Sequence, residues 1–318
     1  MSGELMGGPR VATTAAIVAL LCSVHLLTSC VARRRLITRN KSTPAQSLLT
    51  ADKEWLLQRI DTQYQLLQTL NATVDMVPAL GSVNKGKITE YKDVRAYILF
   101  QKPAKFRIIG LYPVMRNKAF DMVSNGADFR LFVPSKNQFI VGENEPLAVP
   151  AANKLENLRP SIFLDALLIR PTGPQESAVV EDLTDEDNAV YIVHILYHGA
   201  DGQLHLARDV WFDRFQLQIM RQIIFNPTGE ILTDARYSEW KGHDGVPFPR
   251  VMDINRPQDE YGVIITLVKA DINKPIADEK FVLEQPEGTA TQVLASRRDP
   301  HTAAAAAEPC ASRKKNTN

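Results

Sequence analysis

The stretch YILFQKPAKFR, residues 97–107, predicts the fold of this chain more strongly than any other. An apolar run leads into a Lys-Pro turn, and after the turn Phe106 and Ile108 alternate with Arg107. Period-two alternation on either side of a short turn indicates two antiparallel strands. Similar runs, separated by turns rich in Gly, Asn and Pro, continue to about residue 271. The sequence therefore predicts a large antiparallel sheet.

The other expected strands follow from the same alternation and from their turns. Turn chemistry is clearest at residues 125–126 (Asn-Gly), 226–229 (Asn-Pro-Thr-Gly) and 244–245 (Asp-Gly). Strands are expected near residues 72–80, 86–92, 95–101, 105–111, 118–124, 128–133, 138–142, 189–198, 204–212, 216–225, 231–240, 248–255 and 261–271.

Three runs, at residues 97–100, 223–225 and 263–265, are apolar on both faces of their strand. Both faces of the sheet must then be covered at these places. The cover is provided by packing under helices, by dimerisation or by an apolar ligand in a concavity, and the sequence leaves these three open.

Two helices are expected against the sheet. The stretch TPAQ, residues 43–46, matches a capping box with Pro in the first turn, which predicts a helix from about residue 43 to about residue 70. A second, short helix is expected at residues 161–168 (SIFLDALL), between two prolines. One face of the longer helix carries Leu49, Leu56, Ile60, Leu67 and Leu70.

The N-terminus looks like a lipoprotein signal peptide. An apolar run at residues 11–27 ends in Leu27-Thr28-Ser29-Cys30, which resembles a lipobox, and Arg10 precedes it. We therefore expect a signal peptide at residues 1–29, lipidation of Cys30 and a basic tether at residues 30–42. The alternatives are a plain transmembrane anchor, for which the run is short and polar-interrupted, or a cleaved signal with an incidental cysteine.

Composition limits the classes of function. The chain has 318 residues, 45% hydrophobic and 23% charged, and a net charge of +1, so it lacks the basic field that nucleic-acid binding needs. Its cysteines are Cys22, Cys30 and Cys310, which leaves no internal disulfide within the expected domain at residues 43–290. Residues 291–318 carry an alanine run and no core pattern, which predicts a disordered tail.

The sequence offers no catalytic signature and no cofactor motif, so an enzyme is not expected. His194, His198 and His205 are spaced like metal ligands, but in a strand the first two lie about 13 Å apart, too far for one ion. The acidic run at residues 181–187 lacks the glycine-centred spacing of a calcium loop. No metal site is predicted.

Several stretches together resemble the lipoprotein-localisation carrier and receptor family, the LolA/LolB-like proteins of the bacterial periplasm and outer membrane. The resemblance covers residues 45–288 and implies an α+β fold: a curved antiparallel sheet forming an incomplete β-barrel closed by helices, with an apolar cavity for acyl chains. The chain departs from the family in its length and in an insertion-like segment at residues 143–188. The stretches are residues 97–107, WFD at 211–213, YSEW at 237–240, VPFP at 246–249, DEKF at 278–281 and PEG at 286–288.

The resemblance also implies a function and a set of site residues. The expected protein is a lipid-anchored envelope lipoprotein at the outer membrane, which binds acyl chains of lipoproteins or lipids and transfers or inserts them. The alternative is a scaffold or sensor lipoprotein of the same fold that binds a protein partner. The candidate cavity residues are Leu56, Ile60, Leu99, Phe106, Ile108, Phe120, Met122, Phe129, Leu131, Ile223 and Ile265.

One loop matches the receptor's membrane-insertion loop. It is Leu111-Tyr112-Pro113-Val114-Met115, in which Val114 takes the place of the inserted apolar residue. The alternative for this stretch is a buried strand end. An exposed apolar tip would indicate a contact site.

Overall fold

The computed structural model describes residues 47–82, 86–90, 92–144, 159–185 and 187–294. These residues belong to one compact unit. The predicted signal peptide, Cys30, the tether, the capping box at residues 43–46 and residues 295–318 of the predicted tail lie outside the described residues.

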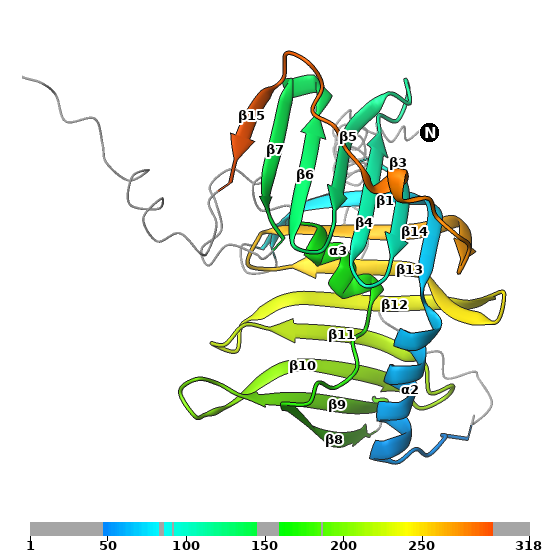
Figure 1. The fold of residues 1–318 in the computed structure, drawn as a ribbon. Helices are drawn as coiled ribbons and strands as arrows, with labels where there is room; N and C mark the ends of the chain where they lie inside the picture. The colour runs from blue at the N-terminus through cyan, green and yellow to red at the C-terminus, as the bar shows by residue number, and fades with distance from the viewer. Residues whose placement is uncertain (1–46, 83–85, 91, 145–158, 186, 295–318) are drawn as a thin grey trace, which may run out of the picture. The chain divides into compact units, whose positions relative to one another are not determined.

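The described strands form a single sheet (Figure 1), in the order β15-β7-β6-β5-β4-β3-β1-β14-β13-β12-β11-β10-β9-β8, with β2 paired to the far end of β1. Every pair is antiparallel except β15 with β7. The strands are β1 (Thr69–Ser82), β2 (Lys87–Glu90), β3 (Val94–Gln101), β4 (Lys105–Leu111), β5 (Lys118–Ser124), β6 (Asp128–Val133), β7 (Gln138–Glu143), β8 (Glu176–Thr184), β9 (Ala189–His198), β10 (Leu204–Asp213), β11 (Ile219–Phe225), β12 (Ile231–His243), β13 (Val246–Arg256), β14 (Tyr261–Ile272) and β15 (Ala290–Val293).

The predicted antiparallel sheet is thus confirmed, and each expected strand has its counterpart. Two strands were not expected. β8 lies in the segment interpreted as an insertion, and its charged residues fit an edge strand that is half exposed. β15 reaches Val293, beyond the expected domain end at residue 290.

The α-helices among the described residues are α2 (Lys53–Leu66) and α3 (Pro160–Leu167), with single turns of 3₁₀ helix at η2 (Pro134–Lys136) and η4 (Asp278–Phe281). The prediction that the long helix starts near residue 43 is wrong. The helix is capped by Asp52, whose carboxylate accepts a hydrogen bond from the Trp55 N–H at 2.8 Å. The chain before it is extended, with the Leu49 N–H donating to the Arg214 carbonyl. The short helix is confirmed, with Pro160 in its first turn.

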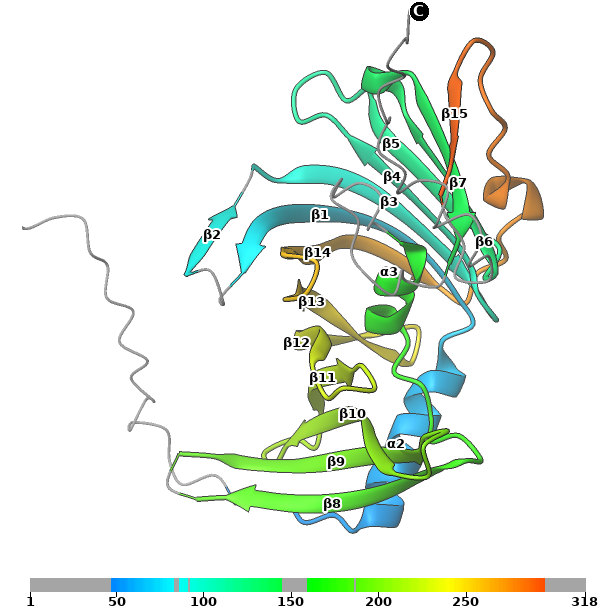
Figure 2. The same ribbon diagram turned by 90° about the vertical axis from the view of Figure 1, so that its left-hand side faces the viewer.

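Both α-helices lie on one face of the sheet, called the inner face below (Figure 2). Along β4, Phe106 and Ile108 point to this face and are fully buried, whereas Arg107 points to the other, outer face. α2 contacts β9 and β13, and α3 contacts β4 and β5. Among the described strands, the end strands β15 and β8 do not pair with each other, so the sheet is open. Closure of a barrel by the helices stays a prediction.

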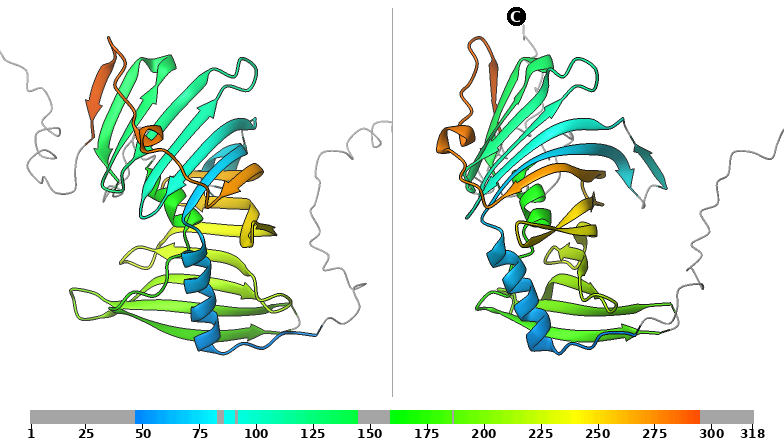
Figure 3. Two further views of the ribbon diagram at one scale, coloured as in Figure 1. Left: turned by 45° about the vertical axis from the view of Figure 1, so that its right-hand side comes forward. Right: turned by 90° about the vertical axis from the view of Figure 1, so that its right-hand side faces the viewer.

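The outer face is covered in part by the C-terminal segment, which crosses it between β14 and β15 (Figure 3). The Arg107 guanidinium donates to the carbonyls of Lys280 and Val282 in this segment. The same guanidinium pairs with Asp121, which is 0% exposed and also binds Lys118 Nζ at 2.7 Å. A small second core, made of Val123, Phe139 and Leu283, lies beneath the segment.

Candidate functional site: the inner face beneath helix α3

The helix α3, with sequence PSIFLDAL, is apolar on almost every side. Six of its eight residues are buried. A helix of two turns is not stable by itself in water, so packing on the sheet must hold α3 in place. The buried residues are Pro160, Ile162, Phe163, Leu164, Ala166 and Leu167.

Aromatic contacts fix α3 to β4 and β6. The rings of Phe163 and Phe106 stack with centroids 5.7 Å apart and planes 14° apart. At the N-terminal end of the helix, the buried Arg159 guanidinium lies 4.9 Å from the Phe129 ring centroid. These contacts place α3 over the inner face of β4 and β6.

Three side-chain hydrogen bonds complete the docking of α3. The Tyr237 hydroxyl donates to the Ala166 carbonyl at 2.9 Å, and Gln222 Nε2 donates to the Asp165 carbonyl at 2.8 Å. Both carbonyls lie in the last turn of the helix, where no intrahelical partner exists. Ser161 Oγ donates to the Asn144 carbonyl at 2.9 Å. Because Tyr237 is buried, its pKa is raised, and the hydroxyl stays a hydrogen-bond donor.

Asp165 is the one carboxylate of α3. Burial raises the pKa of its carboxyl, while the nearby cations Arg170, Arg256 and Arg208 act in the opposite direction. Arg208 and Arg256 are themselves buried, and they pair with Glu176 and Asp259. The C-terminal end of α3 therefore lies near two buried arginines and the exposed Arg170.

Two hollows lie beside the helices in the described part of the chain. A cavity of about 10 Å³ lies between α2, α3 and the strands β12 and β13, with Tyr237 and Phe248 in its wall. This is room for about one water molecule. A larger pocket of about 490 Å³, open to solvent, runs beside α3, and Leu164, Asp165 and Arg170 line it. Residues of α3 therefore line both the small cavity and the open pocket.

The structure brings most of the candidate cavity residues together on this face. Phe120 fits there because its partner on β4 is Gly110, where any Cβ would lie 2.2 Å from the Phe120 ring. The residues that belong to or pack against this core are Leu56, Ile60, Phe106, Ile108, Phe120, Met122, Phe129, Leu131 and Ile265.

The two remaining candidates, Leu99 and Ile223, lie on the outer face. Leu99 pairs directly with the outward-pointing Arg107, and Ile223 follows Gln222, which points inward to α3. Neighbouring residues of a strand point to opposite faces. An acyl chain on the inner face would not reach either side chain.

The loop between β4 and β5 exposes apolar side chains at its tip. Val114 is 90% and Met115 is 74% exposed, and Tyr112 is also exposed. The loop is closed by hydrogen bonds from the Tyr112 N–H to the Asn117 carbonyl and from the Arg116 N–H to the Tyr112 carbonyl. Val114 and Met115 thus project from a short, internally bonded turn.

The three histidines do not form a common site. His194 lies on the outer face, with Nδ1 2.7 Å from Asp209 Oδ1 and Nε2 3.1 Å from Glu181 Oε2. Partial burial lowers the pKa of His194, but hydrogen bonds to the two carboxylates outweigh it, and the net shift is upward. His205 instead contacts Asp201. Within the described residues, no group of three or more His, Cys, Asp or Glu side chains is arranged to hold a metal ion.

Sequence reasoning missed the residues that hold α3. Tyr237, Gln222 and Arg159 were not among the candidates, although a glutamine beside the apolar run 223–225 was a usable signal. Buried polar side chains need partners, so Gln222 in a core strand indicates a polar contact from another element. In the part of the chain that the structure describes, no helix has the length and apolar character to cross a membrane.

The chain matches no protein-family model and no curated protein. Among solved structures, it is similar to a LolA superfamily protein from Nitrosomonas europaea, at 13% identity and a TM-score of 0.47, over 74% of this chain and 99% of that one. It is also similar to a DUF1329 family protein from Desulfovibrio piger, at 14% identity and a TM-score of 0.48, over 71% and 94% of the two chains. A third is a putative outer membrane lipoprotein-sorting protein domain from Vibrio parahaemolyticus, at 10% identity and a TM-score of 0.43, over 71% and 94%. The family that the sequence resembles is therefore also found among its structural neighbours.

Proposed function

We propose that this chain is a lipid-anchored lipoprotein of the bacterial envelope that binds acyl chains on the inner face of its sheet and passes them to a membrane. The observation that carries the proposal is the position of α3, a short apolar helix that covers a continuous apolar surface. In the proposed mechanism, an acyl chain takes the place of α3 on Phe106, Ile108 and Phe129.

The exchange is energetically reasonable because both occupants bury apolar surface. Burial is worth roughly 25 cal/mol per Å², whichever group provides the cover. The side-chain hydrogen bonds of Tyr237, Gln222 and Ser161 hold α3 in place, and each contributes about 1 kcal/mol net to its docking. A helix held mainly by non-directional packing can leave when another apolar group replaces it.

The exposed loop supports the delivery step of the proposal. Val114 and Met115 lie at its tip, where they can enter the acyl region of a membrane without any change in the sheet. An apolar side chain gains about 1.5–3 kcal/mol on full burial. The proposed anchor at Cys30, with two or more acyl chains, would keep the loop near one membrane. An outer-membrane position belongs to the same proposal.

Lipid analysis tests the binding step. A form of the chain that begins at Ser47 is purified without detergent, and native mass spectrometry with lipid extraction measures what it carries. Lipid at one equivalent, or saturable binding of added palmitate, is the expected result. A protein that is empty and also fails to bind palmitate would overturn the proposal and favour the scaffold function, in which α3 stays in place and a protein partner binds elsewhere.

A further inference from the structure

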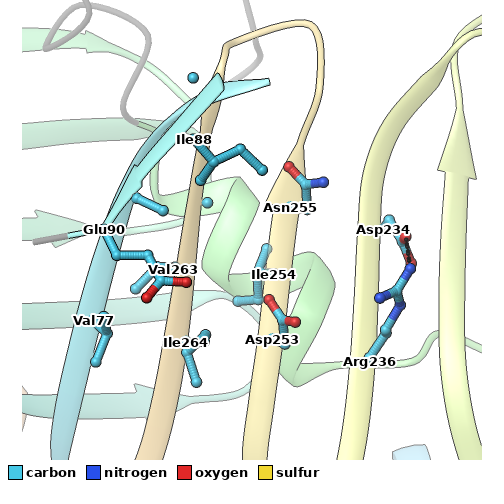
Figure 4. A pocket seen from close by; sticks show the side chains of 13 residues that line it. Val77, Ile88, Glu90, Asp234, Arg236, Asp253, Ile254, Asn255, Val263 and Ile264 are labelled. Atoms are coloured by element: carbon cyan, nitrogen blue, oxygen red, sulfur yellow. Dashed lines mark hydrogen bonds and ion pairs between the residues drawn. The ribbon is translucent and has the colours of Figure 1, made fainter. Parts of the chain in front are cut away.

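A groove of about 260 Å³ lies on the outer face of the sheet, away from α3 (Figure 4). Residues of β1, β2, β12, β13 and β14 line it. Cross-strand register shows that its side chains share one face: Val77 pairs with Ile264, Ile264 with Asp253, and Asp253 with Arg236. The next residue of β12 is Tyr237, which points inward to α3, so the groove belongs to the outer face.

The shape of the groove comes from small residues in its floor. Ala79 and Gly262 face each other across β1 and β14, and neither fills the space above the sheet. A Cβ at Gly262 would lie 3.1 Å from the Ile254 carbonyl oxygen and 3.9 Å from two atoms of Asn255, Cα and Oδ1. Larger apolar side chains, Ile88 and Ile264, stand beside them. The groove therefore has apolar side chains at its sides and small residues at its base, which leave space for a ligand, as small-molecule sites commonly do.

The charges of the lining are mainly negative. The lining contains three carboxylates, those of Glu90, Asp234 and Asp253, and one guanidinium, that of Arg236. Arg236 pairs with Asp234 at 3.1 Å, and Arg221 binds the same carboxylate from outside the groove at 2.6 Å. Figure 4 shows the Asp234–Arg236 pair at one side of the groove, apart from Glu90.

Asp253 and Asn255 are the polar groups with unused capacity. The two residues lie two positions apart on β13, and both line the groove. Within the described residues, neither makes a side-chain hydrogen bond. Burial raises the pKa of Asp253, Arg236 acts against it, and Asp234 and Glu90 raise it further. A cation placed between Asp253 and Glu90 would relieve this repulsion and supply the missing donors.

We propose that this groove binds a small organic ammonium ion. The ammonium group lies between the carboxylates of Asp253 and Glu90 and also donates to the side-chain amide oxygen of Asn255. The alkyl part of the ligand packs against Ile88 and Ile264. The ligand is small because the groove is small. Binding here is independent of acyl binding on the inner face, since the two sites lie on opposite faces of the sheet.

The test titrates the full chain, in a nonionic detergent, with n-butylammonium, and measures binding by calorimetry. n-Butanol has the same alkyl group without the charge, and we expect it to bind at least about tenfold more weakly, because one charge-assisted contact is worth that much. Asp253→Asn should weaken butylammonium binding by about tenfold. Asp271→Asn on β14, which removes an exposed carboxylate outside the groove, should leave it unchanged.

Two further measurements distinguish a loss of the binding site from a loss of folding. Ala79→Leu fills the floor and should abolish binding while the thermal unfolding midpoint stays within a few degrees. Butylammonium binding should also tighten as the pH rises and Asp253 ionises, with Arg236, Asp234 and Glu90 as the charged neighbours. Equal binding of butanol, wild-type affinity in the Asp253→Asn variant, or no saturable binding would each overturn the proposal.

Discussion

Replacing Phe163 by alanine should make acyl binding tighter although it removes part of the core. The ring is buried and stacks on Phe106, so its loss removes much of the contact between α3 and β4. A Phe→Ala change in a core costs about 3–5 kcal/mol. Because α3 is a separate two-turn helix, this loss should fall mainly on the docking of α3 and less on the sheet.

The size of the effect follows from the population of the open state. If acyl chains bind only when α3 is undocked, the apparent Kd equals the intrinsic Kd divided by the undocked fraction. Weakening the docking by about 3 kcal/mol raises a small undocked fraction by about a hundredfold, and the apparent Kd falls by the same factor. Tyr237→Phe, which removes one hydrogen bond worth about 1 kcal/mol, should give a gain of about fivefold.

The assay is a fluorescence titration of the Ser47 form with a fluorescent fatty acid, together with urea unfolding. Phe212→Ala is the matched control, because Phe212 is a fully buried phenylalanine of the same core but is not one of the side chains that stack on α3 or hydrogen-bond to it. It should lower the free energy of unfolding without tightening binding. If folded Phe163→Ala and Tyr237→Phe variants bind no better than wild type, α3 is not a displaceable cover and the reasoning fails.

Three other changes probe the loop, the outer face and the pH response. Val114→Glu should slow transfer of a fluorescent acyl cargo to liposomes about tenfold, since it removes a contact with the membrane worth about 1.5 kcal/mol. Val268→Glu, a control at another exposed valine, should leave the transfer rate unchanged. Equal transfer rates of the two variants would remove the loop from the mechanism. Asp121→Asn should cost about 3 kcal/mol in urea unfolding, because it leaves two cations without their buried carboxylate, and a loss below about 1 kcal/mol would contradict this. His194 has a raised pKa in the folded state, so its stabilising effect is complete below pH 6.5 and disappears as the pH rises through the folded-state pKa. His194→Gln should flatten that decline in the free energy of unfolding and His198→Gln should not, and identical pH profiles of the two variants would refute the assignment.

The strands were predictable because their information is local. Alternation of Phe106, Arg107 and Ile108, and turns such as Asn125-Gly126, depend on neighbours in the sequence. The chain turns at the expected place, with Asn125 Oδ1 accepting hydrogen bonds from the N–H groups of Ala127 and Asp128. The turn is not the expected type I′, because only Gly126 of the pair has a positive φ. Local rules therefore predicted the sheet and most of its boundaries.

The start of α2 was not predictable from the capping pattern alone. The pattern at residues 43–46 and Asp52 both satisfy the rules for a helix start, and only Asp52 caps a helix that the structure describes. The chain just before Asp52 is held by backbone hydrogen bonding of Leu49 to Arg214, more than 160 residues away. A contact at that separation leaves no local signal.

The sequence around Leu99 and Ile223 could not predict to which face of the sheet each side chain points. Each lies in a stretch that is apolar at every position, so alternation does not distinguish the two faces. The polar neighbours do distinguish them: Gln222 faces α3 and Arg221 faces Asp234 on the outer side. Recognising this requires knowing that α3 lies across β11, which is again a long-range fact.

The carrier function and the scaffold function predict different effects of weakening the packing of α3. In a scaffold, α3 is a permanent part of the core, so weakening its packing lowers stability and improves nothing. In a carrier, the docked helix competes with the ligand, so each interaction of α3 with the sheet weakens acyl binding by the same free energy with which it stabilises the closed form. The described contacts of α3 with the sheet include stacking of Phe163 on Phe106, the Arg159 guanidinium over the Phe129 ring, and single hydrogen bonds from Tyr237 and Gln222. Docking of this kind can be reversed by an apolar competitor, and opposite signs of stability and affinity along a series of α3 variants would separate the two functions without any knowledge of the natural ligand.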